Sequence, residues 1–187
     1  MKQATGILGG TFDPAHNAHF AIASAALRAL HLEKILWLPT GTPPYRPAPV
    51  ASAAHRLAML KLAIANEPRY AIDEREQQPG ASGFTFDSIS SLKTEHPKDE
   101  FVLVMGADQY EKRETWHRWP DLVKLCRIAV IERPDSEKPG EDILHIPMAP
   151  LAISASDIRA RIGRNQDVSA MLPPPVLAYI EEHGLYR

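Results

Sequence analysis

The sequence has a single cysteine, Cys126, which excludes an internal disulfide. This cysteine precedes the apolar run 128–131, so we expect it to be a small buried side chain. No apolar stretch approaches the length of a membrane span. Positive charge is not in excess either, because the formal net charge is −2, which gives no overall reason to expect nucleic acid or an anionic membrane as a partner. Nothing at the N-terminus resembles a signal peptide, so we expect a cytoplasmic protein.

Several common site patterns are also missing. The chain has neither the G-x-x-x-x-G-K-S/T phosphate loop nor the G-x-G-x-x-G dinucleotide pattern. His16 and His19 stand three residues apart, whereas the helical zinc-protease pattern needs histidines four apart with an adjacent glutamate. We therefore expect no zinc site.

Strand-like runs alternate with helix-like runs along the chain. This alternation predicts a Rossmann-like α/β fold, an open parallel sheet with helices on both faces. A chain of 187 residues suggests one domain, residues 1–187. The polar segment 135–142 contains Pro and Gly and is expected to be a mobile loop. We expect strands at 4–8, 34–38, 70–72, 101–105, 128–131 and 143–146, and helices at 17–30, 53–65, 84–95, 156–162 and 175–183, with a short helix after residue 106.

The glycine-rich stretch after the first strand is the first candidate site. We expect Gly9-Gly10 to form a tight turn and a helix to start at Asn17. The unpaired N–H groups and partial positive charge of a helix N-terminus favour phosphate, and glycines let the backbone approach it. His16 and His19 would share one face of the first turn, where they can donate to phosphate oxygens. By itself, His-x-x-His is more typical of surface or capping histidines, but its place behind a strand and two glycines favours a phosphate site.

Residues near the end of the chain form a second candidate site. Ser154 and Ser156 precede a helix, and Arg159 lies one turn into it. A common interpretation is an N-cap serine with a surface arginine. The functional interpretation is a second helix N-terminus that binds phosphate, with Arg159 as a clamp. Two such termini facing one cleft would suit a triphosphate.

Further candidates follow from the expected sheet, because its ligands bind at the carboxyl ends of the strands. Asp108 follows a central strand and could meet a ribose hydroxyl, although a solvated helix cap gives the same pattern. Trp116 could stack on a heterocycle or lie in the core. Arg46 and Arg133 could contact phosphate or be solvated surface arginines.

Together these motifs resemble the nucleotidylyltransferase superfamily with its HxGH and ISxxxxR signatures. Within it, the chain most resembles the bacterial nicotinate-nucleotide adenylyltransferases, nearly from end to end. The resemblance rests on Gly9-Gly10-Thr11-Phe12-Asp13-Pro14 with His16 and His19, Ile153-Ser154-x-Ser156-x-x-Arg159, Pro43-Pro44-Tyr45-Arg46, Asp73-Glu74-Arg75-Glu76, Phe84-Thr85, Gly106-Ala107-Asp108, Thr115-Trp116, Glu132-Arg133-Pro134, Leu172-Pro173 and the ending Gly184-Leu185-Tyr186-Arg187.

The resemblance implies that ATP and nicotinate mononucleotide react, with Mg²⁺, to give deamido-NAD and pyrophosphate in NAD biosynthesis. In this family the mononucleotide phosphate attacks the α-phosphorus of ATP directly, without a covalent enzyme intermediate. The implied catalytic residues are His16, His19 and Arg159, and His19 is favoured for the transition state. The implied ATP-binding residues are Gly9, Gly10, Thr11, Phe12, His16, His19, Gly106, Asp108, Ile153, Ser154, Ser156 and Arg159, and the implied mononucleotide-binding residues are Tyr45, Arg46, Thr85, Trp116 and Arg133.

The chain departs from the family pattern in three places. The glycine between the two histidines is Ala18 here, and its methyl group could crowd the nucleotide. Tyr45 stands where the family usually has a histidine. The segment between Pro134 and Ile153 is short, and in relatives this segment carries a subunit contact. Whether the chain forms a homo-oligomer therefore stays open.

Other functions stay open at this stage. Pantetheine-phosphate adenylyltransferases and cytidylyltransferases share the fold and the chemistry, but Thr115-Trp116 and the C-terminal Leu-Pro-Pro at residues 172–174 count against both. A non-catalytic nucleotide-binding module would keep the fold, but the presence of both histidines, Ser156 and Arg159 argues against it. The choice between nicotinate and nicotinamide mononucleotide depends on backbone N–H groups, which side-chain identity does not reveal.

Overall fold

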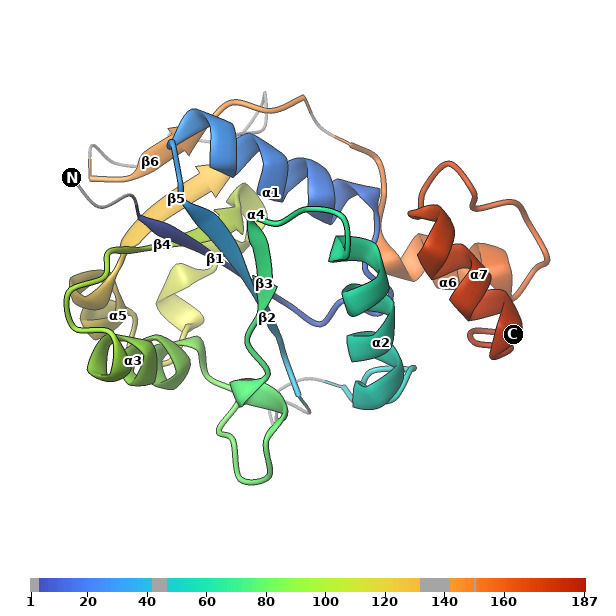
Figure 1. Ribbon diagram of the computed structural model, residues 1–187, viewed down its shortest axis with the longest axis horizontal. Helices are drawn as coiled ribbons and strands as arrows, with labels where there is room; N and C mark the ends of the chain where they lie inside the picture. Colours follow the sequence, from blue (N-terminus) through green and yellow to red (C-terminus); the bar gives the residue numbers. More distant parts are fainter. Residues whose placement is uncertain (1–3, 42–46, 132–141, 150) are drawn as a thin grey trace.

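The computed structural model describes residues 4–41, 47–131, 142–149 and 151–187. Within them, parallel strands form a six-stranded sheet in the order β3-β2-β1-β4-β5-β6, with helices on both sides (Figure 1). The predicted Rossmann-like parallel sheet is confirmed. The strand order reverses between β1 and β4, and ligands of such sheets bind beyond the carboxyl ends of the strands at this point. The strands are β1 (Thr5–Gly10), β2 (Lys34–Pro39), β3 (Tyr70–Ile72), β4 (Phe101–Gly106), β5 (Arg127–Ile131) and β6 (Leu144–Ile146).

The central strands are buried on both faces, which explains their continuous apolar runs. In β4, Val102 and Val104 face the cluster that contains α1 (Asn17–Ala29), whereas Leu103 and Met105 face the cluster beneath α3 (Thr85–Glu95) and α5 (Trp119–Leu125). Cys126 lies in this second cluster as a buried side chain, as predicted, and burial raises the pKa of its thiol to about 12.

Three helices form a third apolar cluster beside the sheet. The cluster joins α2 (Ala53–Ile64) to α6 (Ala155–Ile162) and α7 (Pro174–Glu182) through Met59, Ile158, Val176 and Ile180. Figure 1 shows α6 and α7 beside α2, with the C-terminus at their end. The last helices of the chain are therefore packed on an element that follows the second strand.

The glycine pair does not form the predicted tight turn. Gly9 and Gly10 are the last residues of β1, paired with Leu38 and Pro39 of β2. The ladder continues because the Thr40 N–H donates to the Gly10 carbonyl at 2.9 Å. Pro39 is accordingly the last residue of β2, although we expected the strand to stop before it.

Several short elements were not predicted. They include the 3-10 turns η1 (Arg75–Gln77) and η2 (Arg113–Thr115) and helix α5, which has a proline as its second residue, whereas the short helix expected after residue 106 is present as α4 (Ala107–Glu111). Such elements are too short to show a clear helical apolar period. The loop expected at 135–142 lies outside the described residues, except for Asp142.

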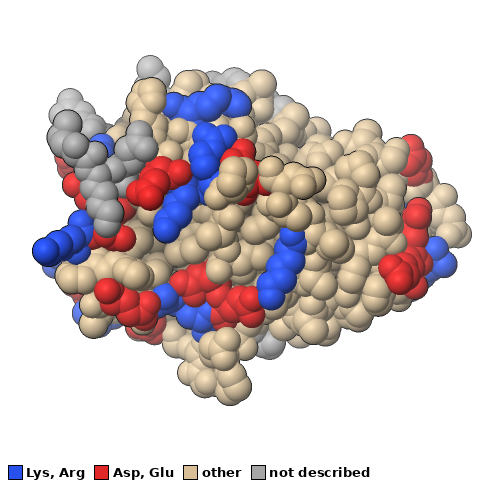
Figure 2. Space-filling model, viewed as in Figure 1, with Lys and Arg blue, Asp and Glu red and all other residues tan. Residues whose placement is uncertain are grey.

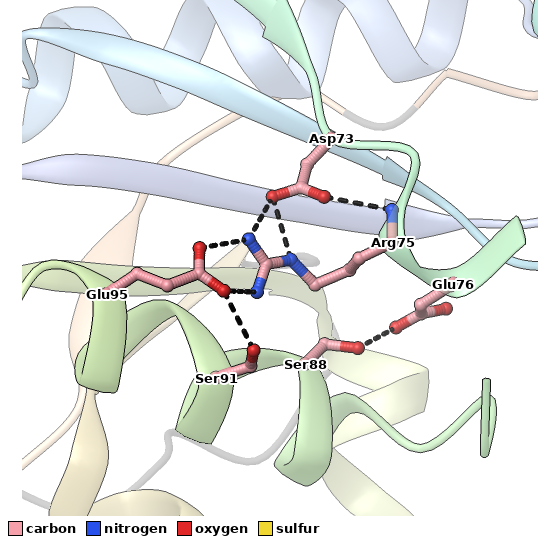
Figure 3. Close-up of polar contacts among 6 residues, drawn as sticks. All are labelled: Asp73, Arg75, Glu76, Ser88, Ser91 and Glu95. Carbon is pink, nitrogen blue, oxygen red and sulfur yellow. Dashed lines mark hydrogen bonds and ion pairs between the residues drawn. The ribbon is translucent and has the colours of Figure 1, made fainter. Parts of the chain in front are cut away.

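Polar side chains fix η1 against α3 (Figure 3). The Arg75 guanidinium donates to Asp73 at 2.8 Å and to Glu95 of α3 at 3.0 Å. The Ser88 hydroxyl of α3 donates to the buried Glu76 carboxylate at 2.8 Å, and burial raises the pKa of Glu76. The chain after β3 is thereby tied to both the N-terminal half and the last residue of α3.

Charges of both signs lie side by side on the face seen in Figure 2, in keeping with the small net charge. In the described part of the chain, no helix is both long and apolar enough to cross a membrane.

The buried Arg56 side chain joins α2 to the loops that follow β1 and β2. Only 1% of this residue is exposed. Its Nη1 donates to the carbonyls of Thr11 and Thr40, both at 2.7 Å, and its Nη2 donates to the Gly41 carbonyl at 3.0 Å. One guanidinium thus holds both loops at the carboxyl edge of the sheet.

Replacing Arg56 with methionine should lower the free energy of unfolding by about 3–5 kcal/mol, because three buried carbonyls lose their donor. Urea unfolding measures this loss. Arg69→Met is the control, since the ion pair of Arg69 with Glu67 is largely exposed and its removal should leave stability nearly unchanged. Equal effects of the two substitutions would contradict the anchoring role of Arg56.

Candidate functional site

The two histidines lie together at the start of α1. His16 is the N-cap residue and is 5% exposed. Its backbone N–H donates to His19 Nδ1 at 3.2 Å, and the two rings are stacked with centroids 3.7 Å apart. His16 Nδ1 is buried and has no hydrogen-bond partner among the described residues. A buried ring nitrogen without a hydrogen-bond partner costs free energy.

Both imidazoles are neutral near pH 7 in this structure. Burial lowers the pKa of His16 to about 4. Burial, and then the charge of His16, lower the pKa of His19 well below its usual value. Because His19 Nδ1 accepts a hydrogen bond, the neutral His19 ring carries its proton on Nε2. The capping hydrogen bond therefore leaves an N–H donor on the far side of the ring.

The N-terminus of α1 is less open than predicted. The Asn17 N–H donates to the Met171 carbonyl at 2.9 Å, and the His19 N–H donates to the His16 carbonyl at 2.9 Å. The Asn17 side chain also donates to the Ala170 carbonyl at 3.0 Å. The expectation of unpaired N–H groups is wrong at Asn17, because the segment before α7 packs on the helix start. The prediction of a phosphate site at this helix start therefore rests on the two histidine rings.

The glycines differ in what they permit. A Cβ at Gly9 would meet no atom within 4 Å, so the backbone there can be approached closely. A Cβ at Gly10 would lie 2.9 Å from the Phe12 ring. Phe12 is buried, has a positive φ of 51° and packs edge-on against His19 at 5.0 Å. The Phe12 side chain therefore packs against His19 from within the core. The nucleotide contact predicted for Phe12 can then involve only its backbone.

The second candidate segment meets the first through Arg159. Ser154 caps α6 by accepting from the Asp157 N–H at 3.2 Å, and its hydroxyl lies 3.2 Å from that of Ser156. Arg159 Nη1 donates to the Asp13 carbonyl at 2.7 Å. The predicted convergence of this segment on the loop after β1 is thus present. The other nitrogens of Arg159 have no partner in the described part of the chain, and the side chain is 29% exposed.

The other predicted residues lie around the same edge of the sheet. Gly106 ends β4 beside β1, and Asp108 lies in the first turn of α4. Thr85 is the first residue of α3, and Trp116 is half-buried with its ring 6.2 Å from that of Trp119. Ile153 packs against the cluster of α2, α6 and α7. The predictions for Tyr45, Arg46 and Arg133 fall outside the described residues.

Three residues that build this site, Asp13, Arg56 and Tyr186, were given no role on the basis of the sequence. Asp13 lies inside the glycine motif, so its position after a strand was a usable signal. Arg56 stands three residues before Met59 and four before Leu60, at the spacing of a buried helix face, which also marks it. Tyr186, whose hydroxyl donates to Asp13 at 2.7 Å, has no local sequence signal.

Across residues 4–41, 47–131, 142–149 and 151–187, no group of three or more His, Cys, Asp or Glu side chains is placed to hold a metal ion.

The unfolding free energy should fall as the pH drops from 6.5 to 4, because the unfolded chain binds a proton at His16 that the folded chain resists. In His16→Asn, which keeps an N-cap residue, the fall should be shallower by up to about 1.4 kcal/mol per pH unit. Urea unfolding at stepped pH measures the slopes. His31→Asn at an exposed position serves as control, and an unchanged slope in His16→Asn would show that His16 is not buried neutral.

Comparison with known proteins places this arrangement in a family. Residues 7–161 match the family described as cytidylyltransferase-like. Proteins named probable nicotinate-nucleotide adenylyltransferase include one from Pseudomonas syringae pv. tomato, 34% identical over 100% of this chain and 95% of its own, and one from Geobacillus thermodenitrificans, 38% identical over 97% of this chain and 85% of its own. The structure of Plasmodium falciparum nicotinic acid mononucleotide adenylyltransferase shares the fold, with a TM-score of 0.82 at 20% identity over 98% of this chain and 97% of that one. The chain therefore belongs to the cytidylyltransferase-like family, among its nicotinate-nucleotide adenylyltransferases.

Proposed function

We propose that the chain transfers the adenylyl group of ATP to nicotinate mononucleotide, giving deamido-NAD and pyrophosphate in NAD biosynthesis. The observation that carries the proposal is that Arg159 bonds to Asp13 in the loop after β1, which leads directly to the stacked His16 and His19 at the point where the strand order reverses. The relatives are named for this activity. The Plasmodium falciparum enzyme of the same fold is complexed with NaAD in one structure and with APC in another.

The proposed reaction is a direct displacement. A phosphate oxygen of the mononucleotide forms a bond to the α-phosphorus of ATP, the bond from that phosphorus to the bridging oxygen breaks, and pyrophosphate leaves with that oxygen. No covalent enzyme intermediate is formed. Such a transfer needs mainly positioning and stabilisation of developing negative charge.

We assign the charge stabilisation to the two histidines and Arg159. The Nε2–H of His19 is fixed as a donor by the cap hydrogen bond at Nδ1, so it needs no proton transfer before it binds a phosphate oxygen. A bound triphosphate would also raise the pKa of both imidazoles, because a nearby anion favours their charged forms. Arg159 would use the nitrogens that the Asp13 carbonyl leaves unengaged. The remaining proposed ATP contacts are Gly9, Gly10, Thr11, Phe12, Gly106, Asp108, Ile153, Ser154 and Ser156.

The mononucleotide would bind on the side of α3. Thr85 begins this helix, whose N-terminal half is fixed to η1 through Ser88 and Glu76. Trp116 would stack on the pyridine ring, with its position set by contact with Trp119. Phe84 of the α3 N-cap stacks on His117 at 4.3 Å, which joins the Thr85 and Trp116 segments. We propose Tyr45, Arg46 and Arg133 as further contacts on the basis of sequence.

Mg²⁺ is proposed to arrive with ATP, since this ion is commonly held by substrate phosphates with few protein ligands. We also propose that the chain acts in the cytoplasm. Residues 1–187 are proposed to work as one domain, because Arg159 of α6 bonds directly to the loop after β1.

The function is tested by pyrophosphate release from ATP and Mg²⁺ with nicotinate mononucleotide, nicotinamide mononucleotide or phosphopantetheine offered singly. We expect release with nicotinate mononucleotide, together with deamido-NAD in equal amount. Release only with phosphopantetheine would assign the chain to another branch of the family. Absence of release with all three would leave a nucleotide-binding module.

His19→Asn should lower kcat by orders of magnitude while ATP still binds. The asparagine side-chain oxygen can accept the His16 N–H in place of Nδ1, so the helix cap is kept and only the Nε2–H is lost. Steady-state kinetics and calorimetric ATP titration measure the two effects. His96→Asn, at an exposed position after α3, is the control, and a wild-type kcat in His19→Asn would remove His19 from the mechanism.

A further inference from the structure

The Asp13 side chain is the meeting point of segments that are far apart in the sequence. It is 4% exposed. One carboxylate oxygen, Oδ2, accepts the Val50 N–H at 2.7 Å. The other, Oδ1, accepts the Ala51 N–H at 3.1 Å and the Tyr186 hydroxyl at 2.7 Å. The last turn of the chain is thereby bonded to the loop that carries the histidines.

A buried carboxylate must be satisfied by donors, because an unpaired buried charge is strongly unfavourable. Arg159 is a further donor close by, since its Nη1 lies 3.9 Å from Asp13 Oδ2. That same Nη1 donates instead to the Asp13 backbone carbonyl at 2.7 Å. The two N–H groups and the Tyr186 hydroxyl supply the carboxylate, so Arg159 is not drawn fully onto it.

We propose that Tyr186 is a positioning residue for ATP, which satisfies the Asp13 carboxylate so that Arg159 keeps its free nitrogens directed at the triphosphate. The inference rests on the proposed function, because it assigns ATP to the site of Arg159. Without the tyrosine hydroxyl, Asp13 Oδ1 loses its shortest hydrogen bond, and the carboxylate competes with ATP for the Arg159 guanidinium.

The placement of Tyr186 supports this role. The neighbouring Leu185 N–H donates to the Ile180 carbonyl at 3.1 Å, which folds the chain end back along α7. Both Leu185 and Tyr186 pack against the cluster of α2, α6 and α7. Burial and the hydrogen bond to Asp13 raise the pKa of Tyr186, so the hydroxyl keeps its proton and remains a donor at neutral pH.

The test compares Tyr186→Phe with Tyr179→Phe in the full chain. The Tyr179 hydroxyl is hydrogen-bonded to His55 Nδ1 at 3.0 Å and belongs to the same helical cluster, but it does not reach Asp13. Each variant loses one hydroxyl, so Tyr179→Phe shows the effect of weakening the cluster alone. We expect Tyr186→Phe to raise KM for ATP by about tenfold, with KM for nicotinate mononucleotide as in Tyr179→Phe.

A double-mutant cycle with Arg159→Ala tests whether Tyr186 changes the KM for ATP through Arg159. If Tyr186 acts through Arg159, Tyr186→Phe should cause no further rise in KM for ATP once Arg159 is removed. Independent, multiplying effects would overturn the proposal. So would equal changes in the KM of both substrates, or an unchanged KM for ATP.

Failure of the proposed function can be told apart from failure of this inference. Should wild-type protein form no product with any mononucleotide, the adenylyl transfer proposal fails, and ATP titration by calorimetry still tests Tyr186. Weaker ATP binding in Tyr186→Phe than in Tyr179→Phe would support the inference. Equal binding in the two variants would overturn it.

Discussion

Two buried charges, the Asp13 carboxylate and the Arg56 guanidinium, determine the shape of the carboxyl edge of the sheet. Each must find partners because an unpaired buried charge is unstable, and each finds most of them in backbone groups of the surrounding loops. Arg56 binds carbonyls that follow β1 and β2, while Asp13 binds N–H groups just before α2. The loops around the site are consequently held as one unit.

In the histidine pair, one structural hydrogen bond also sets the protonation pattern of a ring. The hydrogen bond from the His16 N–H to His19 Nδ1 closes the first turn of α1, and it also decides which nitrogen of His19 carries the proton. Packing of Phe12 against His19 fixes the ring from the core side. Burial keeps both imidazoles neutral near pH 7, because it disfavours their charged forms.

The C-terminal helices complete the site although they lie beside the sheet. Their apolar cluster with α2 positions Arg159, and the chain end returns to Asp13 through Tyr186. The segment before α7 also occupies the Asn17 N–H at the start of α1. Helix α6 and the chain end therefore both form hydrogen bonds to Asp13, in the loop after β1.

The sequence by itself determined the parallel sheet, because buried strands such as β4 must be apolar on both faces, and this leaves a continuous run. It also determined the pairing of His16 and His19, since residues three apart share a helix face. The end of β1 was mispredicted because Gly9 and Gly10 lie in the strand through pairing with β2, which no local pattern reports. Only the tertiary structure decided the roles of Asp13, Arg56 and Tyr186. Their partners are 15 to 173 residues away, and hydrogen bonds over such separations depend on how the elements pack.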